Sequence, residues 1–309
     1  MRGLVFGVIF AGAVLAVSGV LAQSAAPPVE NVTVTGTKSR QVIESFIKSL
    51  AAPTRLTGKI ARWQDGICPV ADGVPPAFGK FLLQHLKDVA ASAGAPVDKH
   101  SSCEANIQIV FTKNPQALLD DIHKNAPDML GYYDNDDQRT QAAQMVRPIQ
   151  AWYTTETVDV RGQTHMDSPK SGGLILRISP KLPPVFIPHA IATNVTGGRL
   201  GDGLHSAFYH VLIVVSPGDL KDYEMGALGD YIAMVALSQL DSLDECQQLP
   251  SIVNMLAKNC SQKTETLTET LTENDTAYLH GLYASRPDSN LNLQEDTIAY
   301  QMEQTAKGH

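Results

Sequence analysis

The sequence predicts an α+β fold, in which a mixed sheet and its helices surround one buried central helix. Apolar residues recur at helical spacing over residues 74–93, whereas over 106–112 they alternate with polar residues, as in a half-buried strand. Residues 208–215 are almost purely apolar, which is typical of a strand buried on both faces. Apolar side chains also surround nearly the whole circumference of a helix predicted over 228–240, so we expect that helix inside the domain.

The first 22 residues have the pattern of a secretory signal peptide. Arg2 is the only charged residue before Glu30, and residues 4–21 form an apolar run. The run ends in Val20-Leu21-Ala22, with the small residues at −3 and −1 that signal peptidase prefers. An uncleaved anchor helix is the alternative, because 18 apolar residues are just long enough to span a bilayer.

We expect three parts along the chain: a signal peptide over 1–22, a flexible lead-in over 23–38 and a single α+β domain over 39–306. After signal cleavage we expect no stable membrane anchor. The 309 residues carry a net charge of −8, with 43 % hydrophobic and 18 % charged residues, as in ordinary globular proteins. This acidic balance argues against a basic groove for nucleic acid, so we expect no nucleic-acid partner.

Helices and strands are predicted to alternate through the first half of the domain. Pro53 ends the first helix, Pro75-Pro76 and Gly94 bound the second, and Asn114-Pro115 begins the third. The β-rich stretches are dominated by Val, Ile, Thr and aromatic residues. The predicted helices cover residues 41–50, 74–93, 114–122 and 138–146, and the predicted strands cover 56–63, 106–112 and 149–160.

A long irregular segment over 162–203 separates the two halves, because its glycines and prolines are too dense for long regular elements. One short strand is predicted within it, at 174–178. The segment is either a functional excursion or an insertion of little consequence. After it we predict the strand at 208–215 and helices at 228–240, 249–256, 272–283 and 293–305. Asp230, the only charged residue inside the 228–240 helix, is expected to act as a structural cap if it lies in the first turn.

The four cysteines, Cys68, Cys103, Cys246 and Cys260, are predicted to form two disulfides. They are even in number and contain no C-x-x-C pair, and an exported chain meets an oxidising compartment. Three pairings are possible. Proximity in the sequence favours Cys68 with Cys103 and Cys246 with Cys260.

Histidines and acidic residues provide the only candidate site. No two of the nine histidines have HExxH or HxH spacing, so we expect neither a metal nor another cofactor. Asp202, His205 and His210 lie where the irregular segment enters the buried strand, and they form a candidate ligand-binding cluster. The alternative is that these three side chains make ordinary hydrogen bonds at the strand end.

Other motifs give no support to known chemistries. Gly-x-Ser-x-Gly is absent, the glycine-rich residues 197–203 lack the Lys-Ser/Thr of a phosphate loop, and residues 134–138 lack the glycine and closing glutamate of a calcium loop. The aromatic residues Trp63, Trp152 and Tyr153 are interpreted either as core residues or as a binding face.

Two segments resemble metzincin-type metalloproteases, whose domain has a zincin-like fold. Residues 249–255 (LPSIVNM) are similar to the turn beneath the metal site, and residues 271–283 (LTENDTAYLHGLY) to the closing helix. The predicted central helix reads LGDYIAMVAL over 228–237, without the His and Glu of HExxH, so the resemblance implies a zincin-like fold without zinc-protease activity. The whole chain also resembles an uncharacterised family of exported proteobacterial proteins, through residues 60–69 and 229–234.

We therefore expect an exported, disulfide-stapled, non-catalytic domain, periplasmic or secreted, that binds a small ligand or an envelope protein. An exported hydrolase-like enzyme that uses the polar groups near 202–210 is the first alternative. A purely structural envelope component is the second.

Overall fold

The computed structural model describes residues 31–100, 102–167, 174–187, 195, 202–241, 243–258, 260 and 268–307, and the side chains of the first helix from Arg40 onward. Its α-helices are α1 Asn31–Leu50, α2 Pro76–Ala93, α3 Pro115–Asn125, α4 Asp136–Ala142, α5 Met225–Leu237, α6 Glu273–Ala284 and α7 Leu291–Lys307. Its strands are β1 Pro69–Asp72, β2 Ile107–Phe111, β3 Ile149–Val158, β4 Thr164–Met166, β5 Leu174–Leu176, β6 Val185–Ile187 and β7 His205–Val215. Short 3₁₀ helices cover η1 Pro127–Leu130, η2 Pro217–Asp219 and η3 Ile252–Leu256.

Five strands form one mixed sheet in the order β1-β2-β7-β3-β4. β1, β2 and β7 run parallel, whereas β3 is antiparallel to β7 and β4 is antiparallel to β3. A separate hairpin pairs β5 with β6. The predicted α+β class and the mixed sheet are therefore confirmed.

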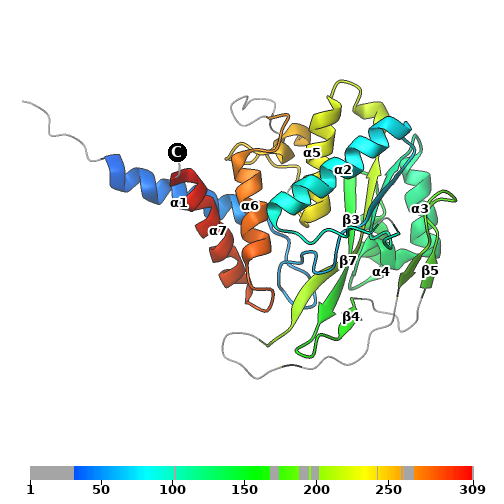
Figure 1. The fold of residues 1–309 in the computed structure, drawn as a ribbon, viewed down its shortest axis with the longest axis horizontal. Helices are drawn as coiled ribbons and strands as arrows, with labels where there is room; N and C mark the ends of the chain where they lie inside the picture. Colours follow the sequence, from blue (N-terminus) through cyan, green and yellow to red (C-terminus); the bar gives the residue numbers. More distant parts are fainter. Residues whose placement is uncertain are drawn as a thin grey trace, which may run out of the picture.

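Strand β7 lies in the middle of the sheet and is buried on both faces. Val211, Ile213 and Val215 point into the larger core, whereas Leu212 and Val214 point into a smaller core on the opposite face. Figure 1 shows α2 and α5 on one side of the sheet and α3 and α4 on the other. The apolar run of β7 follows from this position, because both faces of the strand need apolar side chains.

Helix α5 is buried from Ala227 to its end at Leu237, as its sequence predicts. Every residue from 227 to 237 is shielded from solvent. Trp63 donates its indole N–H to the carbonyl of Ala236 at 2.9 Å, and Tyr153 donates its hydroxyl to the carbonyl of Val235 at 2.7 Å. The buried helix is therefore held by side-chain hydrogen bonds as well as by apolar packing.

Some elements differ from the sequence-based predictions. The predicted strand at 56–63 is wrong: residues 55–57 form a turn, Gly58 has φ +65°, and Ile60 and Arg62 make only isolated bridges. This part of the chain therefore does not run along the sheet as a strand. The predicted helix at 249–256 is only the short η3, and α1 begins at Asn31, within the predicted lead-in.

The irregular segment contains β4, β5 and β6, of which only β5 was predicted. Residues 168–173, 188–194 and 196–201 of this segment lie outside the described residues, as do the predicted signal peptide and residues 23–30 of the lead-in.

Both predicted disulfides are present, Cys68–Cys103 and Cys246–Cys260. They indicate an oxidising environment, because reducing compartments keep such thiols free. Within the described ranges, we find no helix with the length and apolar character needed to cross a bilayer.

Candidate functional site

The structure does not bring Asp202, His205 and His210 together in one cavity. Asp202 accepts a hydrogen bond from the buried ammonium group of Lys59 at 2.7 Å and another from the backbone N–H of Leu204. His205 is half-buried, and burial, together with the charge of Arg62, lowers its pKa. None of these three residues lines any of the four cavities described in the structure.

His210 is fully buried in the middle of the sheet, opposite Thr154 of β3. Among the described residues, neither of its ring nitrogens has a hydrogen-bond partner. Burial lowers its pKa from 6.5 to about 3, so the imidazole is neutral at physiological pH. An imidazole enclosed in this way has no access to a ligand. Its burial lowers the stability of the folded protein, so His210 is a structural residue.

A cavity of about 470 Å³ lies at the amino ends of β1 and β2, and we call it the acidic pocket. Its described lining includes the aromatic residues Phe208 and Tyr209 of β7, and no lysine, arginine or histidine. Four carboxyl groups line it: Asp65, Asp98, Glu104 and Glu156. Among the described residues, the charges that line this space are therefore all negative.

Glu156 is the buried member of this set, with only 6 % of its surface exposed. No described residue donates a hydrogen bond to its carboxyl group. Burial, with added repulsion from Asp65 and Asp167, raises its pKa from 4.5 to about 7. Burial also raises the pKa of the Tyr209 hydroxyl to about 12, with contributions from Glu104 and Glu156. The acidic pocket thus holds a buried carboxyl group whose ionised form no described residue stabilises by a hydrogen bond.

Backbone contacts and a disulfide give the acidic pocket its shape. Asn106 accepts a hydrogen bond from the N–H of Cys68 at 2.7 Å and donates one to the carbonyl of Gly66 at 3.0 Å. A Cβ on Gly66 would lie 2.8 Å from the backbone nitrogen of Asp98, so only glycine permits this close approach. The Cys68–Cys103 disulfide also joins the segment that contains Gly66 to the segment that contains Asn106. Carboxyl groups that are distant in the sequence are thereby held around one space.

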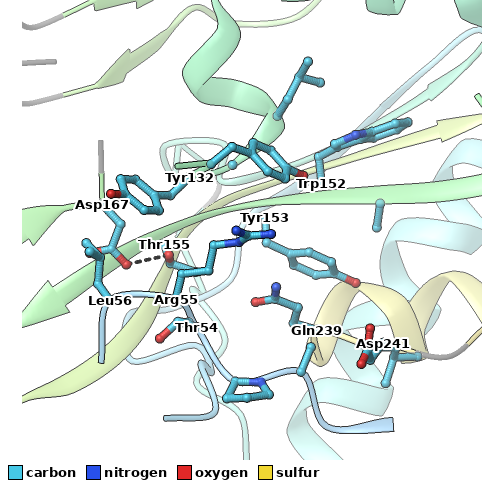
Figure 2. A pocket seen from close by; sticks show the side chains of 17 residues that line it. Thr54, Arg55, Leu56, Tyr132, Trp152, Tyr153, Thr155, Asp167, Gln239 and Asp241 are labelled. Carbon is cyan, nitrogen blue, oxygen red and sulfur yellow. Dashed lines mark hydrogen bonds between the residues drawn. The ribbon is translucent and has the colours of Figure 1, made fainter. Parts of the chain in front are cut away.

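A second cavity, of about 350 Å³, lies beside β3, and we call it the tyrosine pocket. Thr155 lines the tyrosine pocket, whereas the next residue of β3, Glu156, lines the acidic pocket. In Figure 2, Tyr132 and Asp167 lie at one end of the tyrosine pocket, Gln239 and Asp241 lie at the other, and the Arg55 side chain extends between them. Strand β3 therefore contributes residues to both pockets.

Asp167 is the buried carboxyl group of the tyrosine pocket, with 5 % of its surface exposed. It accepts hydrogen bonds from the hydroxyl groups of Thr155 at 2.6 Å and Thr157 at 2.8 Å, the first of which is drawn in Figure 2. Burial raises its pKa, although these hydrogen bonds act in the opposite direction. The side-chain oxygen of Gln239 is buried and has no partner among the described residues.

The three large aromatic residues singled out in the sequence do not form one binding face. Trp63 lies in the larger core and Trp152 in the smaller one, where its indole N–H donates to the carbonyl of Ala142 at 2.7 Å. Tyr153 stacks on Phe208 with ring centroids 5.4 Å apart, although it also lines the tyrosine pocket. Their main role is packing.

The two segments that resemble metzincins contact each other through one buried carboxyl group. Asp275 accepts hydrogen bonds from the hydroxyl of Ser251 at 2.5 Å and from the backbone N–H of Ile252 at 2.8 Å. It also completes a capping box with Thr272 at the start of α6. These contacts fix the turn at 249–255 beneath α6.

Asp230 does not cap α5, because the helix begins at Met225 and Asp230 lies beyond its first turn. Its carboxylate instead contacts the His85 ring nitrogen at 2.6 Å and accepts from the backbone N–H of Leu271 at 2.9 Å. Asp230 therefore links α2, α5 and the segment before α6. The expected cap is replaced by a tertiary contact.

Glu156 and Asp167 were not among the candidates taken from the sequence. The only sign in the sequence was Glu156 itself, which lies between the β-branched residues Thr155 and Thr157 in a segment predicted as a strand. A carboxyl group at such a position is buried wherever other elements cover that face of the sheet. The remaining lining residues come from segments too far apart in the sequence to be grouped without the fold.

The fold and these cavities define the class, which is a disulfide-stapled α+β protein with two pockets that share one strand. Comparisons of the chain with family models, with curated proteins and with solved structures gave no match. The chemistry of the two pockets is therefore the basis on which a function can be proposed.

Proposed function

We propose that this protein is an exported ligand-binding domain of the cell envelope, whose acidic pocket binds a small organic cation. The observation that carries the proposal is Glu156, a buried carboxyl group to which no described residue donates a hydrogen bond and which lines a cavity of about 470 Å³. A buried charge of this kind is costly unless an opposite charge neutralises it. A bound cation supplies that charge.

Two further features favour an organic cation over a metal ion. Within the described part of the chain, no three His, Cys, Asp or Glu side chains come together as a set of metal ligands. Tyr209 also lines the acidic pocket, and aromatic faces attract ammonium and guanidinium groups. Several carboxyl groups spread around one space suit an amine with more than one charged nitrogen.

Export is part of the proposal. The apolar run at 4–21 and its cleavage site support secretion, and the two disulfides fit a periplasmic or extracellular location. A zincin-like architecture without its zinc site is likewise proposed, on the strength of the two segments that Asp275 joins. A non-catalytic role agrees with a central helix that carries neither His nor Glu.

A hydrolase is the second candidate function, because Glu156 has a pKa of about 7 beside Asp65. A carboxyl group with a pKa near the operating pH can act as a general acid, and a second ionised carboxylate nearby suits glycoside chemistry. Release of nitrophenol from a panel of nitrophenyl glycosides would support this second function. That release should be abolished by Glu156→Gln.

The binding proposal is tested by isothermal titration calorimetry of the disulfide-bonded protein with putrescine, spermidine and 1,4-butanediol. We expect both amines to bind and the diol, which has the length of putrescine without its charge, not to bind. Glu156→Gln should weaken amine binding at least about tenfold, as expected when one partner of a buried charge pair is removed. Glu269→Gln, at an exposed position outside the pocket, is the matched control. Equal binding by the Glu156→Gln variant would refute the proposal.

A further inference from the structure

We infer that the tyrosine pocket is a second binding site, and that its ligand is a neutral saccharide of one or two sugar rings. The cavity of about 350 Å³ lies near the lower end of the range of about 300–1,000 Å³ that small-molecule sites occupy. It shares no lining residue with the acidic pocket, so this inference does not depend on the proposed cation site.

The polar groups of the tyrosine pocket are mixed in charge. Asp167 and Asp241 contribute carboxyl groups, whereas Arg55 contributes a guanidinium group that extends between them (Figure 2). Asp134 and Gln138 hold that guanidinium group from outside the pocket, at 2.8 and 2.9 Å. A pocket with both signs of charge favours neither a simple anion nor a simple cation.

Hydrogen-bond capacity remains at both ends of the tyrosine pocket. The buried side-chain oxygen of Gln239 accepts no hydrogen bond from a described residue. Asp167 accepts from two threonine hydroxyls, which leaves lone pairs for a ligand. A ligand with donors at both ends and acceptors in the middle, where Arg55 lies, satisfies all three groups. Sugar hydroxyls are both donors and acceptors.

Aromatic side chains add the apolar surface that a sugar ring needs. Tyr132 lies beside Asp167 in Figure 2, and the guanidinium carbon of Arg55 lies 5.5 Å from the ring centroid of Tyr133. The C–H face of a pyranose can stack on the Tyr132 ring while its hydroxyls reach Asp167. Aromatic rings with a few converging polar groups are the usual lining of small-molecule sites.

An extended peptide fits this pocket less well, although no described strand pairs with the edge of β3 there. β3 pairs with β4 only from Glu156 to Val158. On the edge beside the pocket, Gly131 approaches Tyr153 so closely that a Cβ on Gly131 would lie 2.8 Å from the Tyr153 carbonyl oxygen. The backbone of residues 130–132 therefore occupies space that an added strand would need.

The inference is tested with methyl β-glucoside, N-acetylglucosamine, cellobiose and chitobiose, each at up to about 10 mM, a range that covers weak millimolar dissociation constants. Binding is followed by ligand-observed NMR and by the fluorescence of Trp152, which lines the pocket. We expect at least one saccharide to bind and the peptide tetra-alanine not to bind.

Two variants locate the site. Gln239→Leu should weaken saccharide binding about fivefold, as for the loss of one neutral hydrogen bond, and Tyr132→Ala should weaken it at least as much. Glu156→Gln, which lies outside this pocket, should leave saccharide binding unchanged, and circular dichroism checks that each variant is folded. The inference is overturned if no saccharide binds, if tetra-alanine binds instead, or if both pocket variants bind as the wild type does.

Discussion

Replacing Glu156 with glutamine is expected to stabilise the protein at neutral and alkaline pH and to have little effect near pH 4. The pKa of Glu156 is raised from 4.5 to about 7, mainly by burial. A difference of about 2.5 pKa units corresponds to at most about 3.5 kcal/mol, at about 1.4 kcal/mol per unit. Because the carboxyl group lines a cavity that water can enter, we expect about 1–3 kcal/mol.

The direction follows from proton binding. Between pH 4.5 and about 7 the folded protein keeps the Glu156 proton more often than the unfolded chain does. The contribution of Glu156 to stability is therefore fully present below pH 4.5 and is lost as the pH rises to about 7. Glutamine does not ionise, so the free energy of unfolding of the variant increases relative to that of the wild type over the same pH interval.

Urea unfolding of the wild type and the variant, at several pH values between about 4 and 8, measures this difference. Glu269→Gln, at an exposed position, should show no such dependence on pH. If the stability difference between Glu156→Gln and the wild type stayed constant from acid to alkaline pH, Glu156 would not be an uncompensated buried carboxyl group. The cation-binding proposal would lose its main support as well.

Three other outcomes are expected. The pKa of the buried His210 is lowered from 6.5 to about 3, so the protein should lose stability as the pH falls below 6.5, by up to about 1.4 kcal/mol per pH unit. His210→Leu should remove that part of the loss in urea titrations, and an unchanged loss of stability at acid pH would contradict this expectation. Val235→Asp should destabilise the protein by about 3 kcal/mol or more in the same assay, because it buries a charge within α5, and tolerance within about 0.5 kcal/mol would mean that α5 is not central. Replacing both Cys68 and Cys103 with serine should cost about 4 kcal/mol, from the 35-residue separation of the bridge, and should also weaken amine binding in calorimetry; full retention of binding would show that the bridge does not shape the acidic pocket.

The sequence predicted best the elements whose pattern of apolar residues follows directly from their burial. α5 and β7 are apolar on all sides because they are buried on all sides, so their patterns could be interpreted without knowledge of the fold. The segment at 56–63 has the composition of a strand, but its edges pair only at isolated points, with Pro53 and Ala207. The amino-acid composition of a segment indicates whether it is buried. A strand also needs a neighbouring strand that pairs with it along its length.

The candidate site was less predictable, for a related reason. Asp202, His205 and His210 are close in the sequence, yet a strand turns neighbouring side chains in opposite directions and buries His210 completely. The acidic pocket is assembled from residues such as Asp65, Glu104 and Glu156, which only the sheet brings together. The disulfide pairing was predictable because each bridge closes a short loop.

Because Glu156 and Asp167 lie near the same stretch of β3, their charges influence one another. Asp167 is held by Thr155 and Thr157, the neighbours of Glu156, and its negative charge helps to raise the pKa of Glu156, after the larger effects of burial and Asp65. Protonation of Asp167 therefore makes Glu156 easier to ionise, and so makes the acidic pocket more attractive to a cation, whereas a neutral saccharide leaves the charge of Asp167 in place. Thermodynamic reciprocity requires ionisation of Glu156 to favour protonation of Asp167 by the same factor. Strand β3 therefore couples the titration of two carboxyl groups that lie in different pockets.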